Sequence, residues 1–287
     1  MANNNLPQLK ATLSAPSVKA KFEEMLGKRA AQFMTSIMSV VNNNALLQKA
    51  DVNSIVMGAA TAASMDLSLS PSLGYAALVP FNSKDGCFAQ FQIMTKGLTE
   101  LFIRSGQCQS IINEVVYEGQ LVKKNKFTGE YVFDEDAKKS DKIIGVMAYF
   151  RLTNGFEKYD YMTVEEVNEH AKKFSQTYRK GYGVWRDNWE SMAKKTTLKR
   201  LLTKYAPKSI EMQKMAMFDQ AVIQGDINDI ENAQVVYADN GGTPRHDEAQ
   251  DFQEAVEVVD ESTGEIKDDK PKTKTTSKKS EKKEEEF

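Results

Sequence analysis

Apolar residues recur at helical spacing through the first part of the chain. Intervals of three and four residues predict helices over residues 17–26 and 28–41. Asp51 directly precedes another apolar segment, and an aspartate there favours a capped helix over residues 52–65. The residues before the first helix are polar by comparison, so we expect a flexible N-terminus over residues 1–15.

Strand-like alternation of polar and apolar residues follows. It predicts two strands, residues 74–81 and 87–94, joined by a five-residue turn. On the second strand Gln90 and Gln92 share one face, and a helix over residues 95–104 comes next. Further strands are expected at residues 111–123, 131–133, 143–153 and 156–162. We therefore predict an α+β fold in which an antiparallel β hairpin and meander pack with helices.

Two more helices complete the patterned region. Thr163 and Glu166 form a capping-box sequence ahead of a helix over residues 164–174. A longer helix is predicted over residues 187–205, with Asp187 in a cap-like position. The loop between the two helices is rich in Gly, Tyr and Arg.

The longer helix has two chemically different sides. One arc is apolar and consists of Leu198, Leu201, Leu202 and Tyr205. The other arc is basic and consists of Lys195, Thr196, Lys199, Arg200 and Thr203. We expect the apolar arc to pack on a core and the basic arc to face outward, where it can bind phosphates. Lys194 points toward the leucines, so it is expected to extend to solvent or to meet a partner.

Charge is divided unequally along the chain, although the formal net charge is only −2. Residues 226–287 hold 18 acidic and nine basic side chains, whereas residues 1–225 hold 22 acidic and 29 basic ones. The acidic segment also has few apolar groups, so we predict a largely disordered C-terminal tail over residues 226–287. Residues 16–225 are then the folded domain.

Motifs for bond-breaking chemistry are not found in the sequence. There is no Gly-rich phosphate loop for ATP, and the two histidines, His170 and His246, lack neighbours at metal-ligand spacing. Cys87 and Cys108 cannot make a disulfide framework, and no signal peptide or membrane-spanning apolar run occurs. We expect a cytoplasmic protein that is not an enzyme and has no catalytic residue, metal or cofactor. The enzyme alternative is a DNA nuclease whose catalytic carboxylates are not recognisable in the sequence.

Basic, amide and aromatic side chains recur on neighbouring predicted elements. The candidates for DNA binding are Gln90, Gln92, Lys96, Arg104, Lys172, Lys173, Tyr178, Lys195, Thr196, Lys199 and Arg200. Tyr75, Trp185 and Trp189 are expected either to stack on bases or to fill the core. A basic groove with aromatic rings fits single-stranded nucleic acid better than duplex reading.

Two blocks of sequence resemble the RecT family of phage and prophage single-strand annealing proteins. The first block comprises Gly74-Tyr75, Val79-Pro80-Phe81, Gln90-Phe91-Gln92-Ile93, Lys96-Gly97 and Arg104-Ser105-Gly106. The second comprises Trp189, Met192-Ala193-Lys194-Lys195-Thr196, Leu198-Lys199-Arg200-Leu201, Lys204-Tyr205 and Ser209-Ile210-Glu211. The resemblance runs over roughly residues 16–219, in order and with similar spacing.

The resemblance implies a recombinase that coats single-stranded DNA without ATP and anneals complementary strands. It also implies homo-oligomeric rings or helical filaments, a continuous basic groove holding the annealed duplex, and a phage exonuclease and host single-strand-binding protein as partners in the bacterial cytoplasm. Lys194 joins the DNA-binding candidates on this ground alone. A passive coat protein for single-stranded nucleic acid has the same groove and remains the second alternative.

Overall fold

The structure is a computed structural model that describes residues 5–84, 86–125, 127–207, 209–230 and 232–237. Most of the predicted acidic tail lies outside these residues. Its first part does not: residues 226–237 contain a 3-10 turn, Ile227–Asp229, and a short strand, Gln234–Val236. The expected start of the tail at residue 226 is therefore wrong, because Ile227 and Ile230 bury their side chains in the main core.

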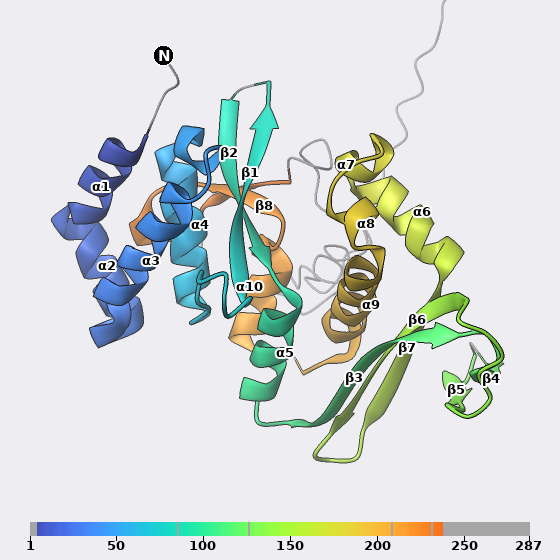
Figure 1. Ribbon diagram of the computed structural model, residues 1–287. Coiled ribbons are helices and arrows are strands. Elements are labelled where there is room, and N and C mark those ends of the chain that lie inside the picture. Colours follow the sequence, from blue (N-terminus) through green and yellow to red (C-terminus); the bar gives the residue numbers. More distant parts are fainter. Residues whose placement is uncertain (1–4, 85, 126, 208, 231, 238–287) are drawn as a thin grey trace, which may run out of the picture.

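Four helices open the chain and lie together at one end of the molecule (Figure 1). They are α1 (Leu6–Ser14), α2 (Pro16–Leu26), α3 (Ala30–Asn42) and α4 (Val52–Ser64). The expectation of a flexible N-terminus is wrong for residues 6–14. Leu9 and Leu13, four residues apart on α1, are both buried, and Asn5 is tied by its side-chain amide to the carbonyl of Ala50 at 2.8 Å.

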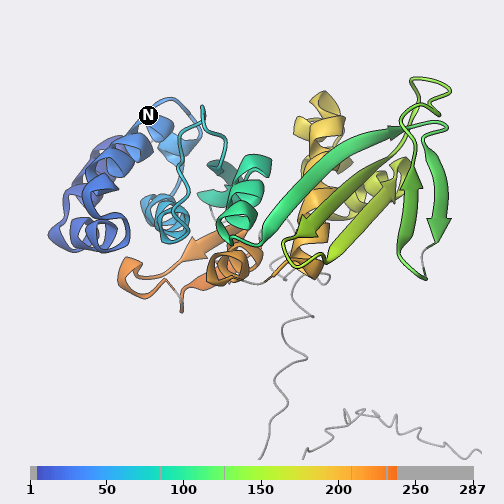
Figure 2. The same cartoon turned by 90° about the horizontal axis from the view of Figure 1, so that it is seen from below.

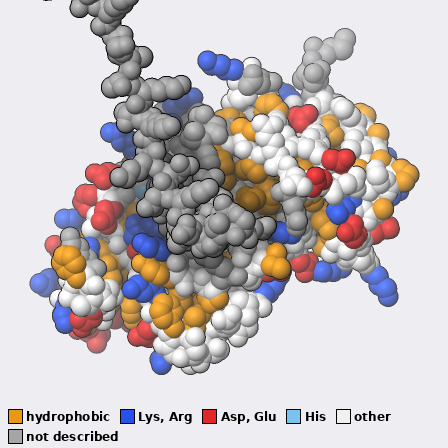
Figure 3. Space-filling view, turned by 180° about the vertical axis from the view of Figure 1, so that it is seen from behind, with side chains coloured by type: hydrophobic (Ala, Val, Ile, Leu, Met, Phe, Trp, Pro, Cys, Tyr) orange, Lys and Arg blue, Asp and Glu red, His pale blue; other side chains and the backbone are white. Residues whose placement is uncertain are grey.

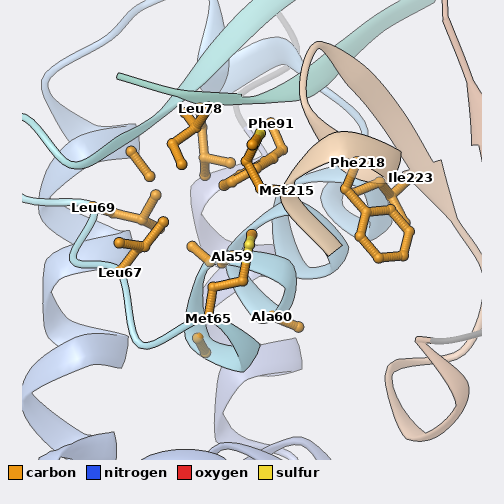
Figure 4. Close-up of a cluster of buried hydrophobic side chains, with 14 of the residues drawn as sticks. Ala59, Ala60, Met65, Leu67, Leu69, Leu78, Phe91, Met215, Phe218 and Ile223 are labelled. Atoms are coloured by element: carbon orange, nitrogen blue, oxygen red, sulfur yellow. The ribbon is translucent and has the colours of Figure 1, made fainter. Parts of the chain in front are cut away.

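The helix α4 is buried along almost its whole length and forms the centre of the main core (Figure 4). Asp51 caps it as predicted, accepting a hydrogen bond from the amide of Ser54 at 2.8 Å. Small residues on α4 let strands approach closely: a Cβ added to Gly58 would lie 2.8 Å from a methyl group of Leu78.

A four-stranded sheet packs on α4. Its strands are β1 (Ala76–Ser83), β2 (Gly86–Ile93), β8 (Ala221–Gln224) and β9 (Gln234–Val236), in the order β1-β2-β8-β9. The predicted hairpin is confirmed, with Ser83 opposite Gly86 at its end. Ala89, Phe91 and Ile93 face the core. Two of the four strands come from the end of the folded chain, and periodicity did not predict them.

A second sheet lies beyond α5 (Thr95–Arg104), as Figures 1 and 2 show. It consists of β3 (Cys108–Tyr117), β6 (Ile143–Leu152) and β7 (Glu157–Thr163), in the order β3-β6-β7. The strands β4 (Leu121–Asn125) and β5 (Glu130–Phe133) pair only with each other among the described residues. The antiparallel α+β class is confirmed. Within the second sheet β3 pairs directly with β6, and the hairpin β4–β5 is inserted between them in the sequence.

The remaining helices are α6 (Val164–Phe174), α7 (Gln176–Arg179), α8 (Val184–Asp187), α9 (Trp189–Tyr205) and α10 (Ile210–Phe218). The capping box at Thr163 and Glu166 is present in full. For α9 the cap is Asn188, whose side chain accepts from the amide of Ser191, whereas the predicted Asp187 ends the short helix before it.

The helix α9 joins two hydrophobic cores. Its C-terminal half, with Leu198, Leu201 and Leu202, belongs to the main core, and Ala193 near its start belongs to a smaller core that includes Val167 and Trp185. Its apolar arc therefore packs as predicted. No helix in the described part of the chain has both the length and the hydropathy to cross a bilayer.

Candidate nucleic-acid interface

A cleft of about 970 Å³ separates the β1–β2 hairpin from α9. Side chains from β1 and β2 line one wall, α9 lines the other, and residues of α6 and of the segment 175–185 line one end. The cleft therefore brings together parts of the chain that are about a hundred residues apart, including Gln92 and Thr196.

The charge of the cleft is strongly one-sided. Five Lys or Arg side chains line it against a single carboxylate, that of Asp160. The five are Lys180, Lys195, Lys199, Arg200 and Lys204. The opposite wall is apolar where β1 contributes Val79 and Phe81. Lys and Arg side chains also reach the surface beside exposed hydrophobic ones on the face seen in Figure 3. An extended polyanion with flat apolar groups matches both walls.

Lys199 lies at the floor of the cleft in a buried ion pair. Its ammonium group is 2.9 Å from a carboxylate oxygen of Asp219, and the two side chains are 5% and 0% exposed. The other carboxylate oxygen accepts a hydrogen bond from the backbone amide of Ile93 at 2.8 Å. Burial acts to raise the pKa of Asp219, but the charges of Lys199 and Lys195 outweigh it, so that pKa is held below its ordinary value.

The basic arc of α9 is therefore not the exposed surface that the sequence predicted. Lys195 and Lys199 are 7% and 4% exposed, and the ammonium group of Lys199 is paired with Asp219, which follows α10. Thr196 and Thr203 line the cleft as well, and the buried hydroxyl of Thr203 has no hydrogen-bond partner among the described residues.

Arg200 lies in the more open part of the cleft and is engaged by Asp160. Its guanidinium group meets both carboxylate oxygens, each at 2.5 Å. Partial burial lowers the pKa of Arg200, and the hydrogen bond and charge of Asp160 more than compensate, so the net shift is upward. Arg200 stays charged, and its side chain is still 44% exposed to a ligand.

The two glutamines of β2 differ in what they can contact. Gln90 is 1% exposed, and its amide nitrogen donates to the backbone carbonyl of Gln220. Gln92 is half-buried and donates to the side-chain oxygen of Gln90 at 2.9 Å. Gln220 has a positive φ of 64°, a conformation that its amide supports by donating to the carbonyl of Phe91 at 2.8 Å. Both glutamines line the cleft. The side chain of Gln90, however, is already used to bind β2 to Gln220, the residue directly before β8.

Several predicted DNA-binding residues lie outside the cleft lining. They are Lys96, Arg104, Lys172, Lys173, Tyr178 and Lys194. Arg104 donates to the backbone carbonyls of Met65 and Asp66 at 3.1 and 3.0 Å, so it closes the C-terminal end of α4. Lys194 meets Glu114 at 2.7 Å, which is the partner expected from its position among the leucines.

The tryptophans and Tyr75 belong largely to the packing of the protein. Trp185 is buried in the smaller core, with Tyr178 edge-on at 6.0 Å. Trp189 is half-buried, and its indole nitrogen donates to Asn168 at 2.8 Å. Tyr75 packs partly against the main core. Its backbone carbonyl would lie 2.1 Å from a Cβ added to Gly97, which explains the glycine at that position.

Three exposed residues that line the cleft are not among the DNA-binding candidates predicted from the sequence. Lys180 and Tyr182 come from the segment between α6 and α8, and Lys204 comes from the last turn of α9. The segment's Gly, Tyr and Arg content was the available signal, but periodicity does not give the direction of a side chain in a loop. Within the described residues no group of three His, Cys, Asp or Glu side chains is arranged to hold a metal ion.

The described chain is an α+β protein in which a cleft lined by five basic side chains lies between a hairpin and a long helix. The RecT family profile matches residues 31–238, so the chain belongs to the RecT family of phage-type recombination and annealing proteins. The chain is 44% identical over 218 residues to the uncharacterized protein YqaK of Bacillus subtilis strain 168, covering 76% of this chain and 72% of that one. It is 28% identical over 251 residues to protein RecT of Escherichia coli strain K12, covering 80% and 87% of the two chains.

Proposed function

We propose that this protein binds single-stranded DNA in the cleft between α9 and the β1–β2 hairpin and anneals complementary strands without ATP. The observation that carries the proposal is the lining of that cleft, where five cationic side chains and one carboxylate converge in a chain of the RecT family. Phosphates would lie along α9, contacted by Lys195, Thr196, Arg200 and Lys204, with Lys180 at the end of the cleft.

Annealing sets a physical requirement that this cleft fits. The protein must neutralise phosphate repulsion while it leaves base edges free to test a partner strand. The apolar wall formed by Val79 and Phe81 offers contact without hydrogen bonds, and the Gln90 amide is already engaged by Gln220. Base edges therefore meet few groups able to read sequence, which supports binding that is independent of sequence.

We further propose that residues 16–237 carry both DNA binding and self-association, and that neighbouring subunits align their clefts into one continuous groove. Rings or helical filaments of that kind would bind an annealed duplex whose length exceeds that of a single cleft. A phage exonuclease that exposes single strands and a host single-strand-binding protein are the proposed partners, in the cytoplasm of a bacterium.

The test is an annealing reaction with purified protein and two complementary oligonucleotides, one of them carrying a fluorescent label. We expect the protein to accelerate duplex formation with no nucleotide present, because pairing is downhill in free energy. An absolute requirement for ATP, or ATP hydrolysis stimulated by DNA, would contradict the proposal.

Two further outcomes separate the proposal from its alternatives. A passive coat protein would bind a single strand without accelerating the pairing of two. A nuclease would shorten an end-labelled single strand in the presence of Mg²⁺, whereas we expect its length to remain unchanged.

A further inference from the structure

A segment of this chain has a composition complementary to the cleft. Residues 247–269 contain ten acidic side chains and a single basic one, Lys267. Apolar residues are interspersed among the acids: Phe252, Val256, Val258, Val259 and Ile266. The cleft has the complementary arrangement, with four cations on α9, a fifth at one end, and the apolar side chains of β1 on the opposite wall. The segment lies outside the described residues, but the point where the described chain ends is known.

The described chain ends close to the cleft. In the β1-β2-β8-β9 sheet, Val236 lies opposite Val222, and Val222 lies opposite Gln90, which lines the cleft. Two strand spacings of about 4.8 Å each therefore separate β9 from the cleft wall. The ten residues from 238 to 247 can span roughly 30 Å when extended. The acidic segment is thus within reach of the cleft of its own subunit.

We propose that the acidic segment 247–269 occupies the cleft in the absence of DNA and competes with single-stranded DNA for it. This inference rests on the proposed DNA-binding function of the cleft. The acidic side chains take the positions proposed for phosphates along α9, and the apolar side chains contact the wall formed by Val79 and Phe81. The tether keeps the segment at a high effective concentration, so even weak binding opposes DNA.

Competition of this kind depends on salt in a specific way. Both the segment and DNA bind through charge, so both weaken as ionic strength rises and the Debye length shortens. The segment carries fewer charges per length than DNA, so a strand long enough to reach all the cations of the cleft displaces it. A strand that reaches only some of these cations displaces it poorly. The protein therefore favours long single strands over short ones at low salt.

A charge-neutralised full-length variant tests the competition. The test variant carries Glu254→Gln, Glu257→Gln, Asp260→Asn and Glu261→Gln. The control variant removes four exposed acids outside the cleft lining through Glu23→Gln, Asp134→Asn, Glu135→Gln and Asp136→Asn. The two variants gain the same net charge, so the general attraction to DNA changes equally.

We expect the test variant to bind a labelled oligo-dT roughly tenfold more tightly than the control at low salt, as measured by fluorescence anisotropy. The ratio should fall toward one as salt rises to about 0.5 M. Equal affinities of the test and control variants at low salt would overturn the inference.

Carbodiimide cross-linking provides a readout that does not require DNA binding. It joins amines to carboxylates in direct contact, so Lys180 or Lys204 should couple to acids within 247–269, and oligo-dT should suppress this coupling. If the cross-links form but the protein binds no DNA, the segment docks in the cleft and the proposed DNA-binding function is refuted. DNA binding without such cross-links would refute the docking alone.

Discussion

The side chains of Lys199 and Asp219 are 5% and 0% exposed, and they form an ion pair in which only Lys199 lines the cleft. A buried ion pair is costly to break, because removing one partner leaves the other charge without compensation. Lys199 therefore has a structural task before any contact with phosphate. A Lys199 variant would therefore not distinguish a loss of DNA binding from a loss of folding stability.

We expect Lys199→Met to lower the free energy of unfolding by about 3–5 kcal/mol, because Asp219 keeps its buried charge. Urea denaturation followed by circular dichroism measures this. Lys204→Met on the same helix is the matched control, and its exposed position should limit the change to about 0.5 kcal/mol. A Lys199 variant as stable as the Lys204 variant would contradict the structural role.

The stability contributed by Asp219 should depend on acid pH. Its pKa is held below the ordinary value of 3.8, so its contribution is complete well above that pH. It is lost as the pH falls from about 4 through the lower pKa of the folded state. We expect the stability difference between the wild type and Asp219→Asn to shrink over this interval. A difference that is constant from pH 7 to pH 3 would be inconsistent with an ionised Asp219.

Lys180 and Lys204 provide the cleaner test of phosphate binding, because both are exposed residues that line the cleft. For Lys180→Gln with Lys204→Gln we expect weaker binding and a flatter salt dependence, by about 1.4 in the slope of log K against log salt. The exposed residues Lys10 and Lys19 on α1 and α2 supply the control pair. Equal slopes in the two double variants would exclude these lysines as phosphate ligands.

At the scale of elements, helices with a strongly periodic apolar pattern could be predicted from the sequence. The contacts that these helices make with distant segments could not. The wheel of α9 correctly placed Leu198, Leu201 and Leu202 in a core. It could not show that Asp219 would pair with Lys199 and accept a hydrogen bond from the Ile93 amide of β2, because those contacts join segments distant in sequence. The contacts of Arg104 were unpredictable for the same reason, since its partner carbonyls at Met65 and Asp66 are almost forty residues away.

Capping sequences predicted the start of a helix more reliably where both capping residues are present, as at Thr163 and Glu166. We expect Thr163→Ala to destabilise the protein by about 1 kcal/mol, because the Glu166 amide loses its acceptor. Thr153→Ala, at an exposed position after β6, is the control and should change stability by less than about 0.5 kcal/mol. Similar unfolding midpoints for both variants would show that the capping box contributes little.

The inserted hairpin β4–β5 has an unusually exposed tip, where Phe127 is 89% exposed. We expect chymotrypsin to cut there first, since exposed loop tips are preferred cleavage sites. The two fragments should elute together from gel filtration, because β3 and β6 pair on either side of the cut. Phe127→Ala should remove this cut, and separate elution of the fragments would contradict the pairing.

At the scale of the whole molecule, the order of strands in the first sheet has a consequence for synthesis. Asp219 and β8 reach their places beside β2 only after about 220 residues have left the ribosome. Until then one edge of β2 is unpaired and Lys199 lacks its carboxylate. Pairings between such distant segments form slowly and expose strand edges meanwhile. The nascent chain therefore has a long interval in which chaperones can engage it, and its folding yield should depend on them.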